Sequence, residues 1–181
     1  FEYPESSIKA LNNVSFSIQP GKTLAIVGKT GSGKSTIVQL LSRLYDINKG
    51  EILIDGKKIN EINLNSLRSQ TGSVPQEVFL FSDTIANNIS FGTFGKENQS
   101  NIDKVKWAAE QAVISNNINK FSEKYNTMVG ERGVTLSGGQ KQRISIARAL
   151  LKNPNILIFD DCLSAVDTET EEKILNNLKY L

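Results

Sequence analysis

Four short runs of hydrophobic residues along the chain predict β-strands. Residues 12–19 alternate apolar and polar side chains, which indicates a strand with one buried face. Residues 23–27 and 156–159 are continuous apolar runs, which are typical of strands buried on both faces. Residues 51–54 also have the pattern of a strand. The pair Asp55-Gly56 predicts a tight turn after the third run. We therefore expect Asp55 to be a turn residue and not a catalytic acid.

Apolar residues at helical spacing predict helices over residues 34–44, 140–151 and 168–181. Asp167 or Thr168 is the expected N-cap of the last helix, whose first turns are rich in glutamate, as the helix dipole favours. No clear strand pattern occurs between residues 77 and 132. One apolar stripe in that stretch comprises Ile102, Val105, Ala109 and Val113. These features indicate a helical insert over about residues 77–135, carried on an α/β core.

A glycine-rich segment lies between the predicted strand at 23–27 and the helix that follows it. Its sequence, GKTGSGKS over residues 28–35, fits the pattern G-x-x-x-x-G-K-[ST] in full. Glycines let successive backbone N–H groups turn inward around an anion, and the helix N-terminus adds its positive end. Lys34 then reaches the β- and γ-phosphates, and the Ser35 hydroxyl ligates Mg²⁺. The nucleotide-binding residues expected here are Gly28, Thr30, Gly31, Ser32, Gly33, Lys34, Ser35 and Thr36.

A second metal anchor is expected at the end of the strand predicted at 156–159. Four apolar residues there deliver Asp160 to the carboxyl edge of the sheet, where open α/β folds bind their ligands. We expect Asp160 to coordinate Mg²⁺ and Asp161 to act on an attacking water. A further glycine-rich turn over residues 136–140, LSGGQ, precedes a helix and is a second potential anion site. It suggests that this surface receives a nucleotide held by another subunit.

With these motifs in this order, the chain resembles the ATP-binding domain of an ABC transporter along nearly its whole length. Residues 136–140 equal the family signature, which implies nucleotide contacts from Ser137, Gly138, Gly139 and Gln140. Gln76 resembles the Q-loop glutamine, which contacts Mg²⁺ and the attacking water and links to the membrane part. Residues 164–167 resemble the D-loop, which reaches across a dimer. Tyr3 stands where the family stacks an aromatic ring on adenine, and the alternative is an ordinary strand aromatic.

The resemblance implies an α/β fold: a P-loop NTPase core with a mixed sheet flanked by helices, an N-terminal antiparallel β part and an inserted helical subdomain. We expect one domain over residues 1–181, with its core in 1–76 and 136–181. The family's switch histidine follows the D-loop helix, whereas this chain has no histidine and ends at Leu181. We therefore expect a fragment of a longer transporter subunit that lacks the C-terminal end of the domain.

Two further segments resemble exporters in particular. Residues 129–133 resemble the exporter X-loop, and residues 81–89 resemble the exporter pattern after the Q-loop. The resemblance implies ATP and Mg²⁺ as cofactors, with ATP sandwiched between the P-loop of one domain and the signature of a second, identical or different, domain. It also implies transmembrane domains as partners and a place on the cytoplasmic face of the cell membrane. Abundant Ile, Asn and Lys favour a bacterial source and hence a bacterial inner membrane.

Composition narrows the chemistry further. The 181 residues carry 21 Lys and Arg against 19 Asp and Glu, a net charge of +2 that gives no support for nucleic acid as a partner. The absence of histidine excludes Ser-His-Asp and Cys-His catalysis and imidazole metal ligands. The single Cys162 cannot form an internal disulfide. Carboxylates, Lys34, hydroxyls, amides and the backbone are left to carry the reaction.

Asp161 departs from the family pattern, which has glutamate at that position. The shorter side chain retracts the carboxylate, and a misplacement of ~1 Å can cost roughly 100-fold in rate. We therefore interpret the chain as the degenerate half of a heterodimeric exporter, or alternatively as a slowly hydrolysing homodimer. A regulatory half that binds ATP with little hydrolysis and completes a partner's active site is the alternative function. A DNA-repair or chromosome ATPase would need long coiled-coil arms, and a small-molecule kinase would leave residues 136–140 and Gln76 unexplained.

Overall fold

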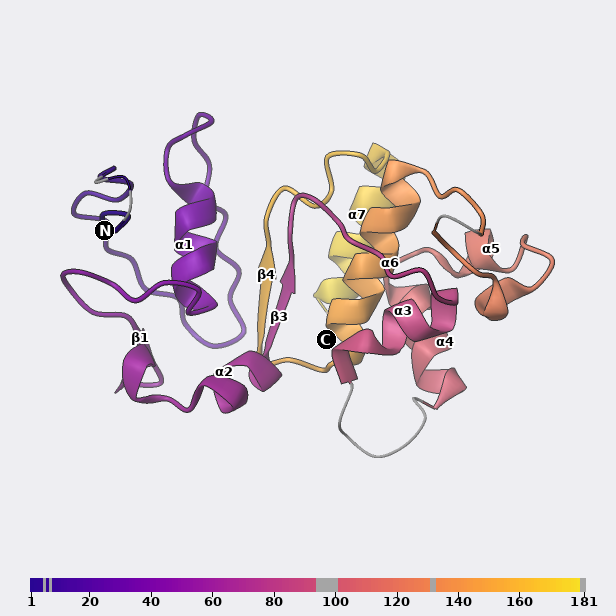
Figure 1. Ribbon diagram of the computed structural model, residues 1–181, viewed down its shortest axis with the longest axis horizontal. Helices are drawn as coiled ribbons and strands as arrows, with labels where there is room; N and C mark the ends of the chain where they lie inside the picture. Colours follow the sequence, from indigo (N-terminus) through magenta and orange to yellow (C-terminus); the bar gives the residue numbers. More distant parts are fainter. Residues whose placement is uncertain (5, 7, 94–100, 131–132, 180–181) are drawn as a thin grey trace. The chain divides into compact units, whose positions relative to one another are not determined.

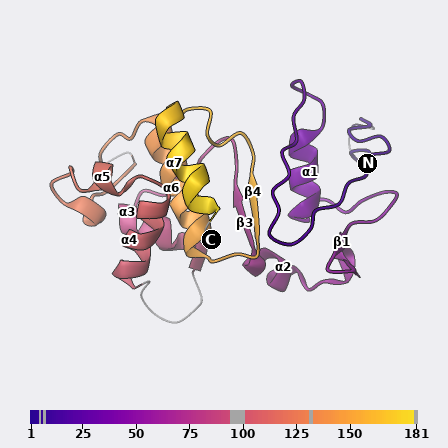
Figure 2. The same cartoon turned by 180° about the vertical axis from the view of Figure 1, so that it is seen from behind.

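The computed structural model describes residues 1–4, 6, 8–93, 101–130 and 133–179 of the chain. They form two compact units, Phe1–Arg68 and Ser69–Leu181, whose elements can be followed from two sides in Figures 1 and 2. The first unit holds the glycine-rich segment at residues 28–35. The second unit holds Gln76, the LSGGQ turn and the Asp160-Asp161 pair. Each unit is described by itself below.

In the first unit, helix α1 (Lys34–Leu41) directly follows the glycine-rich segment. It ends three residues before the predicted Leu44, because Arg43 adopts a positive φ of 47° that a helix cannot contain. Strands β1 (Leu53–Ile54) and β2 (Lys57–Lys58) pair antiparallel. Between them Asp55 and Gly56 have φ values of 50° and 76°, which confirms the predicted tight turn. The 3₁₀ turn η1 (Ile59–Glu61) and helix α2 (Leu64–Gln70) follow.

The prediction of strands at residues 12–19 and 23–27 is wrong. Neither segment joins a β-ladder in the part of the first unit that the structure describes. Their hydrophobic side chains are largely exposed, and Val27 reaches 91% exposure where a strand buried on both faces was predicted. A strand exists only when neighbouring strands take up its N–H and C=O groups. The apolar pattern indicates that these residues tend to be buried, but it does not provide the neighbouring strand.

In the second unit, strand β3 (Thr71–Val74) runs parallel to β4 (Ile156–Phe159), with Val74 opposite Phe159. The strand predicted at 156–159 is therefore confirmed, although Leu157 is 37% exposed and the expected burial on both faces is wrong there. Strand β3 was missed, because four residues that include a glycine and two hydroxyl side chains carry no hydrophobic pattern. Helix α2 immediately before it was missed as well.

Residues 77–130 of the second unit contain helices and 3₁₀ turns, as predicted for the insert. These are α3 (Ile85–Ser90), η2 (Phe91–Thr93), α4 (Ile102–Gln111), α5 (Ser115–Ile118) and η3 (Lys124–Asn126). Helix α6 (Gly138–Leu151) contains the predicted 140–151 helix, and α7 (Thr168–Leu178) begins after an Asp167 N-cap. The last two residues of the predicted C-terminal helix, 180 and 181, lie outside the described residues. None of the helices in the described ranges is both long and apolar enough to span a membrane.

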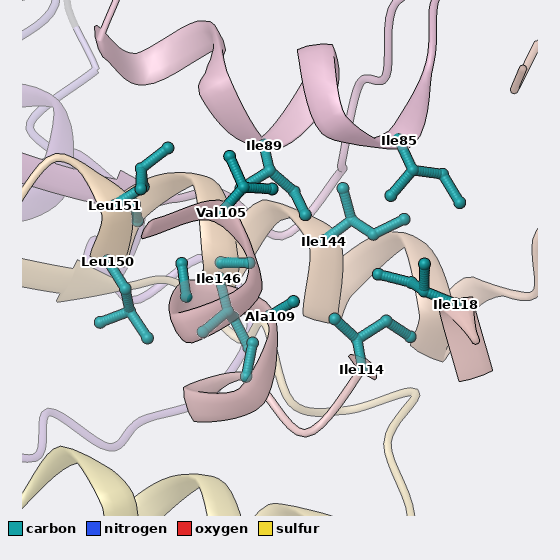
Figure 3. Close-up of a cluster of buried hydrophobic side chains, with 14 of the residues drawn as sticks. Ile85, Ile89, Val105, Ala109, Ile114, Ile118, Ile144, Ile146, Leu150 and Leu151 are labelled. Carbon is teal, nitrogen blue, oxygen red and sulfur yellow. The ribbon is translucent and has the colours of Figure 1, made fainter. Parts of the chain in front are cut away.

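Helix α6 lies at the centre of the second unit and packs against α3, α4 and β3. Figure 3 shows its isoleucine and leucine side chains meeting those of the surrounding helices. Ile144 and Ile146 of α6 are 1% and 0% exposed, and Ile85 and Ile89 of α3 are both fully buried. The apolar stripe of α4 faces the same core through Val105 and Ala109. Burial of this cluster holds the LSGGQ turn at the N-terminal end of α6 on a rigid base.

Truncation of Ile144 to alanine tests this arrangement. Ile144→Ala is expected to lower the free energy of unfolding by about 2–5 kcal/mol, because it removes buried methyl groups and leaves a cavity. Ile102→Ala is the matched control, since Ile102 is 43% exposed at the start of α4. Denaturant unfolding followed by circular dichroism should show a loss for Ile144→Ala that is several times larger. Equal losses would show that α6 is not the centre of the core.

Candidate functional site

The glycine-rich segment forms an exposed loop that leads into α1. Gly31 and Gly33 have φ values of 80° and 91°, which only glycine adopts without strain. At Gly33 a Cβ would also lie 2.6 Å from the backbone oxygen of Ala10, so no side chain fits. The Ser32 N–H donates to the Lys29 oxygen at 3.1 Å and closes the turn. Among the described residues no side chain caps the N-terminus of α1, which leaves that end for an anion.

Lys34 folds its side chain back across this loop. Its Nζ donates to the backbone oxygens of Gly28 at 2.8 Å and Lys29 at 3.0 Å. The ammonium is therefore held at the loop by weakly charged carbonyl partners, which a phosphate oxygen can replace with a stronger, charge-assisted hydrogen bond. Ser35, the next residue, is exposed. Thr36 is buried, and the Thr36 hydroxyl lies 3.0 Å from the Tyr3 hydroxyl.

Tyr3 is fixed against α1 by both its hydroxyl and its ring. The hydroxyl also donates to Gln39 Oε1 at 2.7 Å. The ring makes edge-to-face contacts with Phe1 and Tyr45, with centroid separations of 5.0 and 5.2 Å. These contacts give Tyr3 a structural role behind the phosphate loop. Its stacking on adenine stays a prediction.

The parallel pair β3–β4 brings Gln76 and the two aspartates together at one edge of the sheet. The Asp160 N–H donates to the Val74 oxygen at 3.0 Å and continues the ladder past Phe159. Gln76 lies two residues beyond the end of β3, and its Nε2 donates to Asp161 Oδ2 at 3.1 Å. Asp161, two residues after the end of β4, adopts φ 48°, and Asp160 is half-buried. Gln76 and Asp161 thus form a hydrogen-bonded pair next to Asp160 in the chain, and these three residues are called the polar cluster below.

The chemistry of this cluster fits Mg²⁺. Magnesium prefers oxygen ligands and binds through one or two carboxylates together with substrate phosphates. Asp160 offers a carboxylate. The Gln76 Nε2 donates to Asp161, which leaves the amide oxygen of Gln76 available as a ligand. These residues would hold the ion, and Asp161 is left to act on water.

The LSGGQ turn forms a capping box at the start of α6. Ser137 Oγ accepts from the Gln140 N–H at 3.3 Å, and Gln140 Oε1 accepts from the Ser137 N–H at 2.9 Å. The side chains of both residues thereby hold the turn itself in shape. Ser137 and Gly138 are exposed and present the N-terminus of a 14-residue helix.

The signature turn packs directly on the D-loop segment at residues 164–167. A Cβ on Gly139 would lie 2.5 Å from the Ala165 backbone oxygen, whereas one on Gly138 would lie 3.5 Å from Ala165 Cβ. The buried Gln142 of α6 accepts from the Ala165 N–H through Oε1 at 3.2 Å. Sequence reasoning missed Gln142, because a glutamine two residues after a signature carries no signal of its own.

The two segments that resemble exporter motifs lie side by side. The Val129 N–H donates to the Asp83 oxygen and the Ile85 N–H to the Thr127 oxygen, both at 3.0 Å. The middle of the predicted X-loop, residues 131 and 132, lies outside the described residues. These contacts join the segment after the Q-loop to the segment before the signature.

Sequence reasoning missed two arginines of α6. Arg148 joins the helix to the segment after the Q-loop, and Arg143 joins it to Val113, which follows α4. Arg148 donates to the backbone oxygen of Asn88 at 2.8 Å and of Phe79 at 3.1 Å, and its charge lies over the ring of Phe81. Arg143 donates to the Val113 oxygen. Burial lowers the pKa of both guanidinium groups, although Asp167 acts in the opposite direction on Arg143. Arginine remains charged at neutral pH in either case.

Cys162 takes no part in the chemistry of this site. Its side chain is 1% exposed, and burial raises the pKa of the thiol to about 12. A thiol with such a pKa is not ionised at neutral pH and is a poor nucleophile. Cys162 instead packs in the core under the Asp160-Asp161 pair.

The phosphate loop before α1 and the polar edge of the β3–β4 sheet define the class of the protein, an α/β nucleotide-binding protein of the P-loop type. Residues 11–164 match the family described as ABC transporter, and the chain belongs to that family.

Several relatives place the chain among exporters. It is 50% identical over 181 residues to an "ATP-dependent lipid A-core flippase" of Aliivibrio fischeri, covering 100% of this chain and 31% of the flippase. It is 53% identical to the "Multidrug resistance-like ATP-binding protein MdlA" of Buchnera aphidicola, covering 99% of this chain and 30% of that protein. The chain thus spans about a third of the length of the curated relatives that it matches.

A solved structure supports the same assignment. The structure described as a bacterial Atm1-family ABC exporter with ATP bound matches with a TM-score of 0.90 and 45% identity, over 99% of this chain and 31% of that one. The predicted fold and the predicted exporter-type ATP-binding domain are therefore confirmed. The names of the relatives favour ATP-driven transport over the alternative of a purely regulatory half. The degenerate-half interpretation of Asp161 is not confirmed by them.

A pair of neighbouring glycines tests the packing of the signature turn. Gly139→Ala is expected to displace the D-loop, because its Cβ would overlap the Ala165 oxygen, whereas Gly138→Ala makes only an ordinary contact. Amide hydrogen exchange at residues 165–167 should therefore be faster in Gly139→Ala and unchanged in Gly138→Ala. The same exchange rate in both variants would contradict the close approach.

The N-cap of α7 predicts a dependence of stability on pH. Asp167 Oδ1 accepts from the Thr170 N–H at 2.9 Å, and hydrogen bonds from Thr170 lower the pKa of the carboxyl below its ordinary value of 3.8. A lowered pKa stabilises the folded chain above pH 3.8, and this contribution is lost as the pH falls through the folded-state pKa. The melting temperature of Asp167→Asn, which keeps a cap without the charge, should lie below that of the native chain at pH 7. The two should converge at lower pH, and a constant difference would contradict the assignment.

Proposed function

We propose that this chain binds ATP and Mg²⁺ and hydrolyses ATP to drive export across a membrane. The observation that carries the proposal is the Gln76–Asp161 hydrogen bond at the edge of the β3–β4 sheet. It supports a role of Asp161 and Gln76 together in a chain that also has a complete phosphate loop. Phosphate binding alone would need only the loop.

Each residue has a defined part in the proposed reaction. Backbone N–H groups of residues 28–35 and the Lys34 ammonium hold the phosphates. Ser35, Gln76 and Asp160 would hold Mg²⁺, whose chemistry when bound would be to neutralise charge on the phosphate oxygens. Asp161 accepts a hydrogen bond from the attacking water and orients it toward the γ-phosphorus. As the water oxygen bonds to the γ-phosphorus, the bond from the γ-phosphorus to the β–γ bridging oxygen breaks. ADP keeps that oxygen, and both protons of the water leave on the inorganic phosphate.

The partners follow from the position of the signature. Ser137, Gly138 and Gly139 lie at an exposed helix N-terminus, and the chain's own phosphate loop already provides one such anion site. The signature therefore serves the ATP of a second ATP-binding domain, and Gln140 supports it through the capping box. Transmembrane domains complete the transporter and place this chain on the cytoplasmic face of the membrane, the inner membrane in a bacterium. Closure of the pair on ATP is a population shift driven by tighter ATP binding to the closed state.

The short side chain of Asp161 makes its own site slow. The carboxylate is one methylene nearer to the backbone than that of a glutamate, and its Oδ2 accepts a hydrogen bond from Gln76. Hydrolysis therefore requires that Asp161 reach the water across a longer gap. The site binds ATP normally, because none of the phosphate-binding residues depends on this side chain.

Steady-state ATP hydrolysis by the complete transporter tests the function. Lys34→Ala is expected to abolish Mg²⁺-dependent turnover, and Asp161→Glu is expected to raise kcat by about tenfold, which is about 1.4 kcal/mol of barrier. Lys57→Ala is the surface control, since Lys57 is exposed in β2 and belongs to none of the motifs. Hydrolysis that survives Lys34→Ala would overturn the function. Brisk native turnover that glutamate does not improve would show that Asp161 is fully competent and that the transporter is an ordinary homodimeric exporter.

A further inference from the structure

The signature helix and Asp161 are joined by a continuous set of hydrogen bonds through the D-loop. Gln142 of α6 accepts from the Ala165 N–H at 3.2 Å. The neighbouring Ser164 donates its hydroxyl to the Asp161 backbone oxygen at 3.0 Å. The Asp161 side chain in turn accepts from Gln76 at 3.1 Å. All three hydrogen bonds lie within the second unit.

Burial distinguishes the two ends of this set. Gln142 is 6% exposed on the central helix of the core, so its side chain is held in one position by its neighbours. Ser164, Ala165 and Asp161 are exposed and follow strand β4 in an irregular segment. The rigid end is therefore the helix, and the segment that it fixes is the D-loop. Gly139 adds a steric limit, since its Cα faces the Ala165 oxygen too closely for any side chain.

We propose that Gln142 is a positioning residue for ATP hydrolysis, which holds the D-loop against the signature helix and thereby sets the orientation of Asp161. Movement of the signature turn then shifts Ala165, Ser164 and the Asp161 backbone together. In this way a shift of the helix whose N-terminus contacts the partner's nucleotide also moves the Asp161 carboxylate in the chain's own site. The inference rests on the proposed function, because it assigns Gln142 a part in that hydrolysis.

The test compares substitutions at Gln142 in the complete transporter. Gln142→Met keeps the length and approximate volume of the side chain but removes the acceptor, whereas Gln142→Glu keeps an acceptor oxygen. Loss of the Ala165 hydrogen bond in Gln142→Met should lower kcat by about fivefold or more, with KM for ATP within about twofold of the native value. Gln142→Glu should recover most of that loss. A kcat for Gln142→Met within about twofold of the native value, or no recovery in Gln142→Glu, overturns the proposal.

The exposed end of the set gives a second variant that does not touch the core. Ser164→Ala removes the hydroxyl that reaches Asp161, and Ser164→Thr keeps it. Because Gln142 and Ser164 act through the same segment, the double variant Gln142→Met/Ser164→Ala should be less impaired than the product of the two single effects. Fully multiplicative effects overturn the coupling. If Gln142→Met melts early, the Ser164 pair decides the question: an unchanged kcat in Ser164→Ala counts against the proposal.

Hydrogen exchange separates this inference from the proposed function. The Ala165 amide is protected by Gln142, so its exchange should accelerate in Gln142→Met and stay slow in Gln142→Glu, whether or not ATP is hydrolysed. A native transporter that binds ATP without hydrolysing it would contradict the proposed function, and exchange at Ala165 would still decide whether Gln142 holds the D-loop. Unchanged exchange in Gln142→Met overturns the positioning role even where hydrolysis is observed.

Discussion

Burial of helix α6 is the interaction on which the functional residues of the second unit depend. Ile144, Ile146 and Leu150 are each 2% exposed or less, so the helix has little freedom to shift without opening cavities in a close-packed core. The signature turn lies at its N-terminal end and the Arg148 contacts lie near its C-terminal end. Helix α6 therefore fixes the positions of the LSGGQ turn, the D-loop contact and the segment after the Q-loop.

The polar cluster at the sheet edge depends on a different constraint, the parallel pairing of β3 with β4. The register places Val74 opposite Phe159, so the residues that follow both strands emerge at the same edge. Gln76 and Asp161 are 85 residues apart along the chain and yet lie within hydrogen-bond distance. A hydrogen-bonded pair of exposed groups is weak by itself, and a nucleotide with its metal can readily rearrange it. The strands hold the backbone while the side chains stay free to take new partners.

The motifs were predictable to different degrees for physical reasons. The phosphate loop is a local structure in which Gly31 and Gly33 have positive φ, so residues 28–35 could be recognised from their order alone. The same holds for the Asp55-Gly56 turn and for the Asp167 cap of α7. Strand β3 and the arginine contacts of α6 could not be recognised, because a strand of four mixed residues and a buried guanidinium acquire their roles only from distant partners.

The sequence by itself determined the family, the order of the motifs and the chemistry available to them, since spacing within a loop or a helix is fixed by local geometry. The tertiary structure decided which of these residues meet. It left residues 12–27 without a ladder, because pairing needs a neighbouring strand that no local pattern supplies. It brought Gln142 to Ala165 and Gln76 to Asp161, because helix packing and strand register bring together residues that lie far apart in the chain.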